Sequence, residues 1–491
     1  MLNVMLKGHD FRYEIGELIK VFGLFKDINF ISDNIQYDHK DDFFLINEVV
    51  DGEKKYIVST KLIKNKELIG FDERICHKNS GIENRKELKR KIKLSIFEVL
   101  GEISDNEISW GILTGIRPTK IVHELLDQNH NLNEISDILR KEYKISNEKA
   151  RLVTDVAMVE RKYVYPINED LVSIYISIPF CPTRCVYCSF PSNPVKKGSS
   201  KIEEYLNALY IEIKRTSELL HEANKMVETI YIGGGTPTTL SSVQLDELIK
   251  HVLKAFDVSR LKEFTVEAGR PDTIDIHKLQ VLKENGVHRI SINPQTMNGR
   301  TLSLIGRQHT PEEIENAFYM ARKVGFRTIN MDIIIGLPNE GIEEIKNTLE
   351  SIKKLSPENL TVHTLAIKRS SKLKESMEEF EMAKETLANE MLALTKSYSH
   401  GMGLYPYYMY RQKYMVGNLE NVGYCKRDHE CIYNIQIMEE KQSIIALGAG
   451  AISKIAFPKE NRLERVPNVK NVDEYIKRVD EMVERKRKQL L

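Results

Sequence analysis

Three cysteines within eight residues constrain this chain more than any other feature. The run is Cys181-Pro-Thr-Arg-Cys185-Val-Tyr-Cys188, and it follows the β-rich stretch at residues 173–178. This C-x3-C-x2-C spacing supplies three thiolates, whereas complete protein ligation of a [4Fe–4S] cube takes four. Zinc sites usually bring their ligands as two separated pairs, and no second pair follows closely here. The spacing therefore predicts a [4Fe–4S] cluster with one iron open to a ligand that is not protein.

Charge and hydropathy exclude some classes of partner. The 491 residues include 72 Lys plus Arg against 71 Asp plus Glu, so a basic surface of the kind that binds nucleic acid is not expected. No apolar run approaches the roughly 18 residues that span a bilayer, and no secretion signal is recognisable. We expect a soluble cytoplasmic protein without a membrane span, whose six cysteines are reduced. The charged run at residues 484–488 is typical of a solvated helix end.

Strand and helix patterns alternate between residues 173 and 365. The predicted strands are 173–178, 229–232, 263–267, 289–293, 328–335 and 360–365, and the predicted helices are 202–220, 244–255, 274–284, 311–324 and 342–355. This alternation predicts an α/β fold built on a partial parallel (β/α)6 barrel, in which chemistry occurs at the C-terminal strand ends. The cysteine run, residues 233–237, Glu267, Gln295 and Asp332 all fall near such ends. We therefore expect one composite site.

The flanking regions have different patterns. Residues 43–50 and 55–62 predict two strands joined at Asp51-Gly52, and residues 85–163 are mostly helical with a break at 114–119. A last helix is predicted from about Val472, with Asn471 as its cap. We predict a small α/β domain at 1–80, a helical connector at 81–165, the barrel core at 166–373, and a mixed C-terminal region at 374–491 that covers the substrate.

The motifs as a set resemble a known family. The cysteine run, with Tyr175 before it and Gly233-Gly-Gly-Thr-Pro237 after the second strand, resembles the radical S-adenosylmethionine (SAM) superfamily. More narrowly, it resembles the oxygen-independent coproporphyrinogen III oxidase group. The resemblance continues through residues 266–271, 286–296, 304–307 and 331–338. The extended N-terminus and the segment Thr114-Gly-Ile-Arg-Pro-Thr119 are similar to the HemZ-type branch.

The resemblance implies a [4Fe–4S] cluster and SAM as cofactors, with particular residues holding each. The implied roles are cluster ligation by Cys181, Cys185 and Cys188, proximity of Tyr175 to SAM, binding of the methionine amino end by Gly233, Gly234, Gly235 and Thr236, contacts of Glu267 and Asp332 with the ribose and amino groups, a bond from Gln295 to the ribose, and pairing of Arg307 with the methionine carboxylate. Taken alone, the glycine run is more often just a turn, and each of the residues Glu267, Gln295, Arg307 and Asp332 is as typical of a structural salt bridge at a strand end.

The resemblance also implies a reaction. A 5′-deoxyadenosyl radical would abstract hydrogen from a propionate of coproporphyrinogen III, and loss of an electron and carbon dioxide would leave a vinyl group. Two such events would give protoporphyrinogen IX in heme biosynthesis. The implied partners are a tetrapyrrole substrate, an electron donor such as reduced flavodoxin or ferredoxin, and an acceptor that the sequence does not identify. Lys368, Arg369, Arg411 and Lys413 are candidates to meet the substrate carboxylates.

Some positions depart from the oxidase pattern. Phe190 stands where many oxidases have a fourth cysteine, and Ser177 where the family often has His. Phe190 is typical of the related heme-chaperone branch, but residues 433–438 and Ile452 lack the histidines usual in that branch. A heme-binding chaperone, or radical modification of another tetrapyrrole, therefore stays an alternative. Cys76, Cys425 and Cys431 are interpreted as buried structural thiols, although the last two could contact a second cluster.

Overall fold

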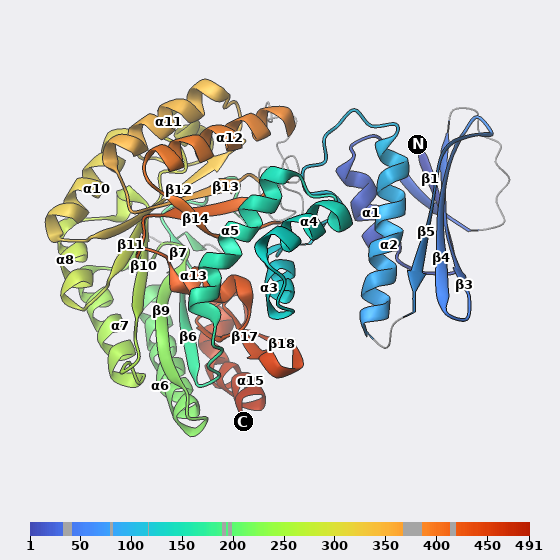
Figure 1. Cartoon of the computed structure of the whole chain (residues 1–491). Coiled ribbons are helices and arrows are strands. Elements are labelled where there is room, and N and C mark those ends of the chain that lie inside the picture. Colours follow the sequence, from blue (N-terminus) through green and yellow to red (C-terminus); the bar gives the residue numbers. More distant parts are fainter. Residues whose placement is uncertain are drawn as a thin grey trace. The chain divides into compact units, whose positions relative to one another are not determined.

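The chain folds into two compact units, Met1–Asp155 and Val156–Leu491. The computed structural model describes residues 1–32, 42–78, 82–115, 117–188, 193–194, 199–366, 385–412 and 419–491. Figure 1 shows the elements of both units, coloured along the chain. The finer division into four domains stays a prediction. No helix in the described part of the chain has both the length and the apolar character needed to cross a membrane.

The first unit contains a five-stranded sheet in the order β2-β1-β3-β4-β5. The predicted hairpin is present, because its two strands pair antiparallel from Phe43↔Lys64 to Asp51↔Tyr56. The other three strands of this sheet and the helix after the first strand were not predicted. The elements are β1 (Leu2–Lys7), α1 (Arg12–Val21), β2 (Ile28–Ile31), β3 (Phe43–Asp51), β4 (Lys55–Lys64), β5 (Glu67–His77), α2 (Ile82–Gly101), α3 (Thr119–Asp127), α4 (Leu132–Tyr143) and α5 (Asn147–Val164), which runs into the second unit.

One face of this small sheet carries the core of the first unit. Leu45, Val58 and Leu62 from the sheet pack with Ile15 of α1 and Ile96 of α2, and all five are fully buried. Alternation along β4 places Val58, Thr60 and Leu62 inward, as expected for a strand with one buried face. The predicted helical character of residues 85–163 is confirmed by α2 to α5.

The second unit is organised around an eleven-stranded sheet. Six adjacent parallel strands match the six predicted strands: β6 (Leu171–Ile178), β9 (Met226–Gly234), β10 (Glu263–Gly269), β11 (Arg289–Ile292), β12 (Thr328–Ile335) and β13 (Asn359–Thr364). A seventh parallel strand, which was not predicted, comes from the C-terminal region and pairs with β6. Both ends of this array are extended by C-terminal strands, namely β14 (Tyr405–Tyr410), β15 (Asn421–Cys425), β16 (Ser443–Leu447), β17 (Ile452–Phe457) and β18 (Arg462–Pro467). The open strand order describes a partial barrel, as predicted.

Helices cover the outer face of the parallel strands, as Figure 1 shows for α6, α7, α8, α10 and α11. The helices of this unit are α6 (Ser200–Glu222), α7 (Ser242–Ala255), α8 (Ile276–Glu284), α9 (Gly299–Leu304), α10 (Pro311–Val324), α11 (Ile342–Leu355), α12 (Glu385–Gly401), α13 (Ile432–Glu439), α14 (Val472–Lys477) and α15 (Val479–Leu490). Local signals set the ends of α10, since Thr310 and Glu313 form a capping box and Gly325 takes a left-handed conformation after the last turn.

Two predicted helices differ from the structure. The helix predicted from residue 274 begins at Ile276, because Pro271–Thr273 forms a 3₁₀ turn and the Asp275 side chain caps the helix by accepting from the backbone of Lys278. The last helix starts at Val472 with the predicted Asn471 cap, but it breaks at Arg478 into α14 and α15.

Candidate active site

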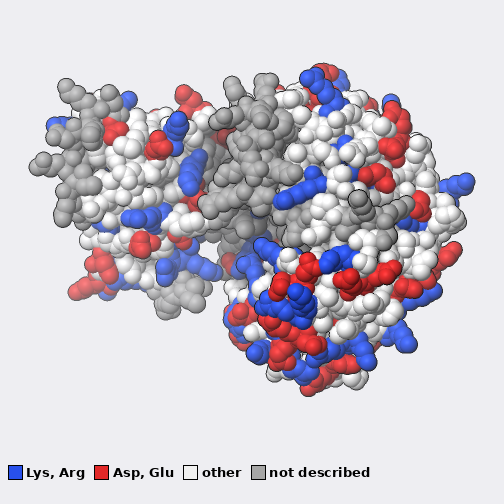
Figure 2. Space-filling model, turned by 180° about the vertical axis from the view of Figure 1, so that it is seen from behind, with Lys and Arg blue, Asp and Glu red and all other residues white. Residues whose placement is uncertain are grey.

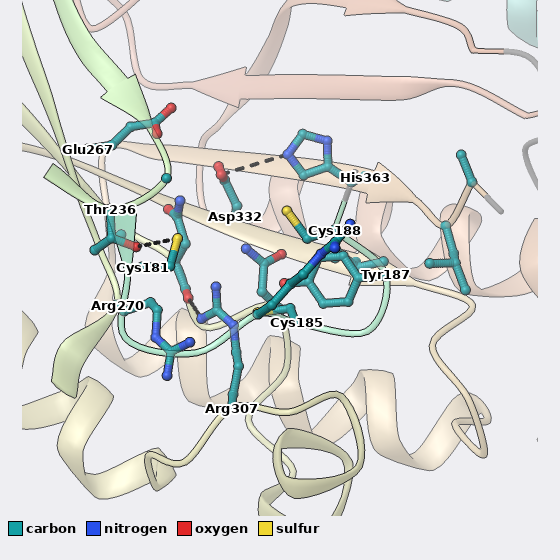
Figure 3. A pocket seen from close by; sticks show the side chains of 18 of the residues that line it. Cys181, Cys185, Tyr187, Cys188, Thr236, Glu267, Arg270, Arg307, Asp332 and His363 are labelled. Carbon is teal, nitrogen blue, oxygen red and sulfur yellow. Dashed lines mark hydrogen bonds and ion pairs between the residues drawn. The ribbon is translucent and has the colours of Figure 1, made fainter. Parts of the chain in front are cut away.

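A cavity of about 270 Å³ lies at the C-terminal ends of the parallel strands. Figure 3 shows the side chains around it. Residues that follow or end β6, β9, β10, β11, β12 and β13 all contribute to its lining. Of the residues singled out from the sequence, the cavity brings together Cys181, Cys185, Cys188, Gly234, Gly235, Thr236, Glu267, Gln295, Arg307 and Asp332. The expectation of one composite site is therefore met by the geometry.

The cysteine loop is held from two sides. The hydroxyl of Thr183 donates to the carbonyl of Gly306 at 3.0 Å, and the backbone N–H of Val186 donates to Ile305 at 3.1 Å. Arg270 donates to the Thr183 hydroxyl at 2.7 Å, while a two-pronged contact with Asp272 at 2.8 to 2.9 Å fixes its guanidinium. These contacts fix the path of the loop independently of any metal.

The first cysteine of the run is largely buried. The thiol of Cys181 is 9% exposed, and burial raises its pKa to about 11, although the Thr236 hydroxyl at 3.6 Å acts in the opposite direction. Such a thiol is protonated at neutral pH unless a cation replaces the proton, and metal ligation does so. Cys185 is equally buried, and Cys188 is more exposed.

The glycine run after β9 leaves no room for side chains. A Cβ on Gly235 would lie 2.5 Å from the carbonyl oxygen of Phe180 and 3.0 Å from the Sγ atom of Cys181. Gly234 has a φ of +108°, which L side chains rarely adopt. A Cβ on Gly233 would lie 2.9 Å from the carboxyl carbon of Glu267. The run therefore lets the β9 backbone approach both the cysteine loop and the first carboxylate of the cavity.

The two carboxylates of the cavity have opposite electrostatic environments. Burial raises the pKa of Glu267 to about 7, and the Asp332 charge adds to this, while a 2.6 Å hydrogen bond from the Tyr231 hydroxyl opposes it. Burial would also raise the pKa of Asp332, but the neighbouring His363 and hydrogen bonds with Asn330 and Thr361 outweigh it, so the pKa lies below its usual value. At neutral pH, Asp332 is anionic and Glu267 is close to its titration midpoint.

Three polar atoms in the cavity lining point to a ligand. Among the described residues, Oδ1 of Asn293, Oε1 of Gln295 and Nε of Arg307 are buried without a hydrogen-bond partner. Gln295 also has a φ of +67°, a conformation that costs a residue with a side chain roughly 1 to 2 kcal/mol. Buried polar groups are normally paired, and strained residues cluster at functional sites. The cavity thus presents donors and acceptors that fit a polar organic group beside the cysteines.

Comparison with known proteins agrees with this geometry. The radical SAM superfamily matches residues 175–352. The oxygen-independent coproporphyrinogen-III oxidase-like protein HemZ of Bacillus subtilis (strain 168) is 40% identical over 411 residues, which cover 82% of this chain and 81% of HemZ. The chain belongs to the HemZ/HemN-like family of radical SAM proteins.

Two further relatives are similar to this HemZ/HemN-like protein. The heme chaperone HemW of Bacillus subtilis (strain 168) is 39% identical over 198 residues, which cover 40% of this chain and 50% of HemW. The chain therefore spans half the length of that chaperone. The solved structure of coproporphyrinogen III oxidase (HemN) from Escherichia coli matches with a TM-score of 0.53 and 24% identity, over 67% of this chain and 73% of that chain. The likeness shows the same fold.

Membership in the superfamily gives the cofactors of this radical SAM protein. They are a [4Fe–4S] cluster and SAM, as predicted. The cavity fits both, because three thiols line one part of it and unpaired polar atoms line the rest. A cluster needs thiolates, and SAM carries ammonium, carboxylate and hydroxyl groups that suit carboxylate, guanidinium and amide partners.

Some residues singled out from the sequence lie elsewhere in this HemZ/HemN-like chain. Tyr175 and Gly233 do not line the cavity, and the Tyr175 ring packs instead against both Tyr231 and Tyr433, which also stack on each other. Arg411 is 3% exposed and is not a lining residue, and burial lowers its pKa to about 10. Phe190, Lys368, Arg369 and Lys413 lie outside the described residues.

The thiols outside the cysteine run are buried and free, as interpreted from the sequence. Cys425 and Cys431 belong to an apolar cluster with Tyr407, Tyr408 and Tyr433, and neither lines the cavity. Burial raises the pKa of both thiols far above the usual range. The geometry is that of structural cysteines.

Sequence reasoning missed several lining residues, chiefly His363, Tyr410, Arg270 and Asn293. His363 is a polar residue near the end of a predicted apolar strand, and that position could have identified it. Arg270 and Asn293 stood inside quoted motifs without a role. Tyr410 comes from the C-terminal region, and no local pattern places it beside the barrel.

Proposed function

We propose that this protein catalyses the oxygen-independent oxidative decarboxylation of coproporphyrinogen III to protoporphyrinogen IX, as a step of heme biosynthesis in the cytoplasm. One observation carries the proposal. Three thiols, two carboxylates and a buried guanidinium converge in one cavity. The chain is also similar, over most of its length, to HemZ, which is named as an oxidase-like protein. An electron donor such as reduced flavodoxin or ferredoxin and a separate electron acceptor complete the proposal.

The proposed roles follow from the geometry of the cavity. When bound, the reduced cluster and SAM supply a 5′-deoxyadenosyl radical that removes a hydrogen atom from a substrate propionate. Cys181, Cys185 and Cys188 hold the cluster. Arg307, whose Nη1 donates to the Asn293 carbonyl at 2.5 Å, keeps its Nε for the SAM carboxylate. A fixed guanidinium of this kind orients a carboxylate at little entropic cost.

The remaining proposed SAM ligands are acceptors and amides. Glu267 and Asp332 accept hydrogen bonds from the ammonium and ribose hydroxyls, and Gln295 contributes its unpaired Oε1. Gly234 and Gly235 bring backbone atoms close to the methionine amino end. Tyr175 acts indirectly, because its ring packs against Tyr231, whose hydroxyl donates to Glu267.

The substrate side of the cavity is polar. His363, Tyr410, Gln412 and Asn421 form part of its lining. Ala366 also lines the cavity, and in the sequence it lies two and three positions before the predicted cations Lys368 and Arg369. Gln412 directly precedes the third predicted cation, Lys413. Those cations are the proposed partners of the substrate carboxylates.

The test is an anaerobic assay of reconstituted protein with SAM, a strong reductant, an electron acceptor and coproporphyrinogen III, followed by mass analysis of the porphyrins. The expected result is two successive losses of carbon dioxide with two hydrogen atoms. Cys185→Ala should abolish both losses, and Cys425→Ala, which leaves the cavity intact, should not. SAM cleavage with the porphyrin unchanged would reject the proposal, and a methylated product would indicate radical modification of a tetrapyrrole.

A second candidate function is heme binding by a chaperone on the same fold. The similarity to HemW, together with Phe190 at the place of a fourth cysteine, favours it. A heme titration distinguishes the two. A shifted Soret band at micromolar heme, in protein that leaves coproporphyrinogen III unchanged, would favour the chaperone.

A further inference from the structure

His363 links two parts of the cavity wall. It lies on β13 beside β12, with Ile334 as its register partner. Its Nε2 atom lies 3.7 Å from Oδ2 of Asp332, and its Nδ1 atom lies 3.2 Å from the Tyr410 hydroxyl. Figure 3 shows the ring directed at Asp332. The imidazole therefore bridges a barrel carboxylate and a hydroxyl of β14, which belongs to the C-terminal region.

The rest of the Asp332 environment is also well defined. Its Oδ1 atom accepts a 2.7 Å hydrogen bond from the Asn330 side chain, and Thr361 fixes that amide with a 3.0 Å bond to its oxygen. Asn330 thus positions one carboxylate oxygen, and His363 faces the other. Each oxygen retains a lone pair directed elsewhere, since a carboxylate offers about four acceptor positions.

The bridge is consistent with one tautomer of a neutral imidazole. The Tyr410 hydroxyl donates to Nδ1, and Nε2–H points toward Asp332. Phe cannot reproduce either interaction, and Gln can supply only one donor toward the carboxylate. Of these three residue types, only histidine offers an acceptor toward Tyr410 on one side of its ring and a donor toward Asp332 on the other.

The other ionisable groups that face Asp332 come from three strands. Glu267 on β10 is close enough for the Asp332 charge to raise its pKa. The phenols of Tyr231 on β9 and of Tyr408 and Tyr410 on β14 also sense this charge. Among these neighbours in the described residues, His363 is the one whose ring nitrogen faces Oδ2 of Asp332.

We propose that His363 is a positioning residue, which holds Asp332 as an anionic acceptor facing the cavity and joins it to Tyr410 of the C-terminal region. The proposal rests on the proposed function only in assigning Asp332 to the hydroxyls of SAM. Without His363, Asp332 would keep the Asn330 bond but lose its neighbouring ring nitrogen, and burial would then favour its protonated form.

The test is anaerobic SAM binding to reconstituted holoprotein at pH 6 and pH 8.5. His363→Phe should raise the Kd about tenfold at pH 6, where a larger fraction of Asp332 would then be protonated, and about threefold at pH 8.5, where less of it would be. His363→Gln should recover part of the loss at both pH values. Tyr410→Phe should raise the Kd about threefold at pH 6, since Nδ1 loses its donor.

Tyr405→Phe is the matched control, because it removes a hydroxyl from the other end of β14, where the partner is Glu430 outside the cavity. It should leave the Kd unchanged. An unchanged Kd in His363→Phe, or a loss by the same factor at both pH values, would overturn the proposal. If the His363→Phe variant does not assemble its iron–sulfur cluster, the Tyr variants decide instead. Equal Kd values for SAM in Tyr410→Phe and Tyr405→Phe would then overturn the proposal. Failure of the proposed function would be seen separately, as normal SAM binding by the wild type with coproporphyrinogen III unchanged.

Discussion

The hydroxyl of Tyr231 donates a 2.6 Å hydrogen bond to the carboxylate of Glu267. The Tyr231 ring stacks on Tyr433 of α13 at 4.5 Å between ring centres, and Tyr433 stacks on Tyr175 at 6.1 Å. A helix from the C-terminal region therefore helps to hold the residue that fixes Glu267. Gly233 leaves the space that this carboxylate occupies.

Removing this hydroxyl should make SAM binding more dependent on pH. The bond from Tyr231 lowers the pKa of Glu267, which burial has raised to about 7, so Tyr231→Phe should raise the pKa further. More of the variant would then have a neutral Glu267 at pH 7. We expect the Kd for SAM to rise about fivefold at pH 7, from the loss of about 1 kcal/mol, and to recover toward the wild-type value by pH 9. Tyr319→Phe, at an exposed position of α10, is the control. If the Kd for SAM depended on pH in the same way in the wild type, Tyr231→Phe and Tyr319→Phe, the expectation would be contradicted.

Gly235→Ala should impair cluster assembly. Its Cβ would approach the Phe180 carbonyl to 2.5 Å and Cys181 Sγ to 3.0 Å, so the cysteine loop would have to move. We expect iron content and visible absorbance after reconstitution to fall to less than about a third of the wild-type values, because disturbing a residue that positions a metal ligand typically weakens metal affinity about 10- to 100-fold. Gly299→Ala is the control, since its Cβ would be in ordinary contact with Pro311 at 3.9 Å. Equal iron contents for the two variants would show that the close approach is unimportant.

Cysteine substitutions should divide into two classes. Cys185→Ala should abolish iron–sulfur absorbance and turnover together, because the cluster loses one of three ligands. Cys431→Ala should leave both nearly unchanged and should lower the free energy of unfolding by about 1 kcal/mol, since a buried thiol in contact with Glu263 is lost. Iron well above four atoms per chain, reduced in Cys431→Ala, would instead indicate a second cluster.

The sequence predicted the barrel because its signals are local. Each parallel strand is a short apolar run beside an amphipathic helix, and features such as Thr310 and Gly325 define the helix ends. The lining residues that lie at the ends of predicted strands, such as Glu267 and Asp332, could be predicted from the sequence. Tyr410 and Tyr433 could not be placed, because their positions depend on how the C-terminal strands and α13 pack against the barrel. The charged run at 484–488 was interpreted as solvated, yet Lys486 is fully buried.

Lys486 of α15 forms a 2.6 Å ion pair with Glu212 of α6, and both side chains are fully buried. The Glu212 carboxylate also accepts hydrogen bonds from Tyr475 at 2.5 Å, from Asn468 at 2.8 Å and from the backbone N–H of Gly448 at 2.7 Å. The four donors satisfy a charge that would otherwise be too costly to bury. This network joins four segments of the C-terminal region, namely α14, α15 and the residues that follow β16 and β18, to the first barrel helix.

The network continues toward the cysteine loop. Gly448 lies against Tyr205 and Ser177, where a Cβ would be 2.4 Å from the Tyr205 hydroxyl. That hydroxyl donates to the Ser177 carbonyl at 2.5 Å, and the Ser177 hydroxyl donates to the Ala449 carbonyl at 3.0 Å. Ser177 lies four residues before Cys181, so the position where the family often has His is here part of the connection between the C-terminal region and the end of β6.

Lys486→Met should therefore destabilise the second unit by roughly 3 to 5 kcal/mol, because it leaves Glu212 buried without its cation. The double variant Glu212→Gln/Lys486→Met removes both charges and should regain much of this loss, since replacing a buried pair costs far less than breaking it. Hydrogen exchange of peptides from α6, α15 and residues 443–449 measures the effect where it arises. Lys488→Met, on the same helix, controls for loss of one positive charge. If these peptides exchanged hydrogen at the same rate in Lys486→Met and Lys488→Met, the buried ion pair would not be what stabilises the packing of α15 on α6.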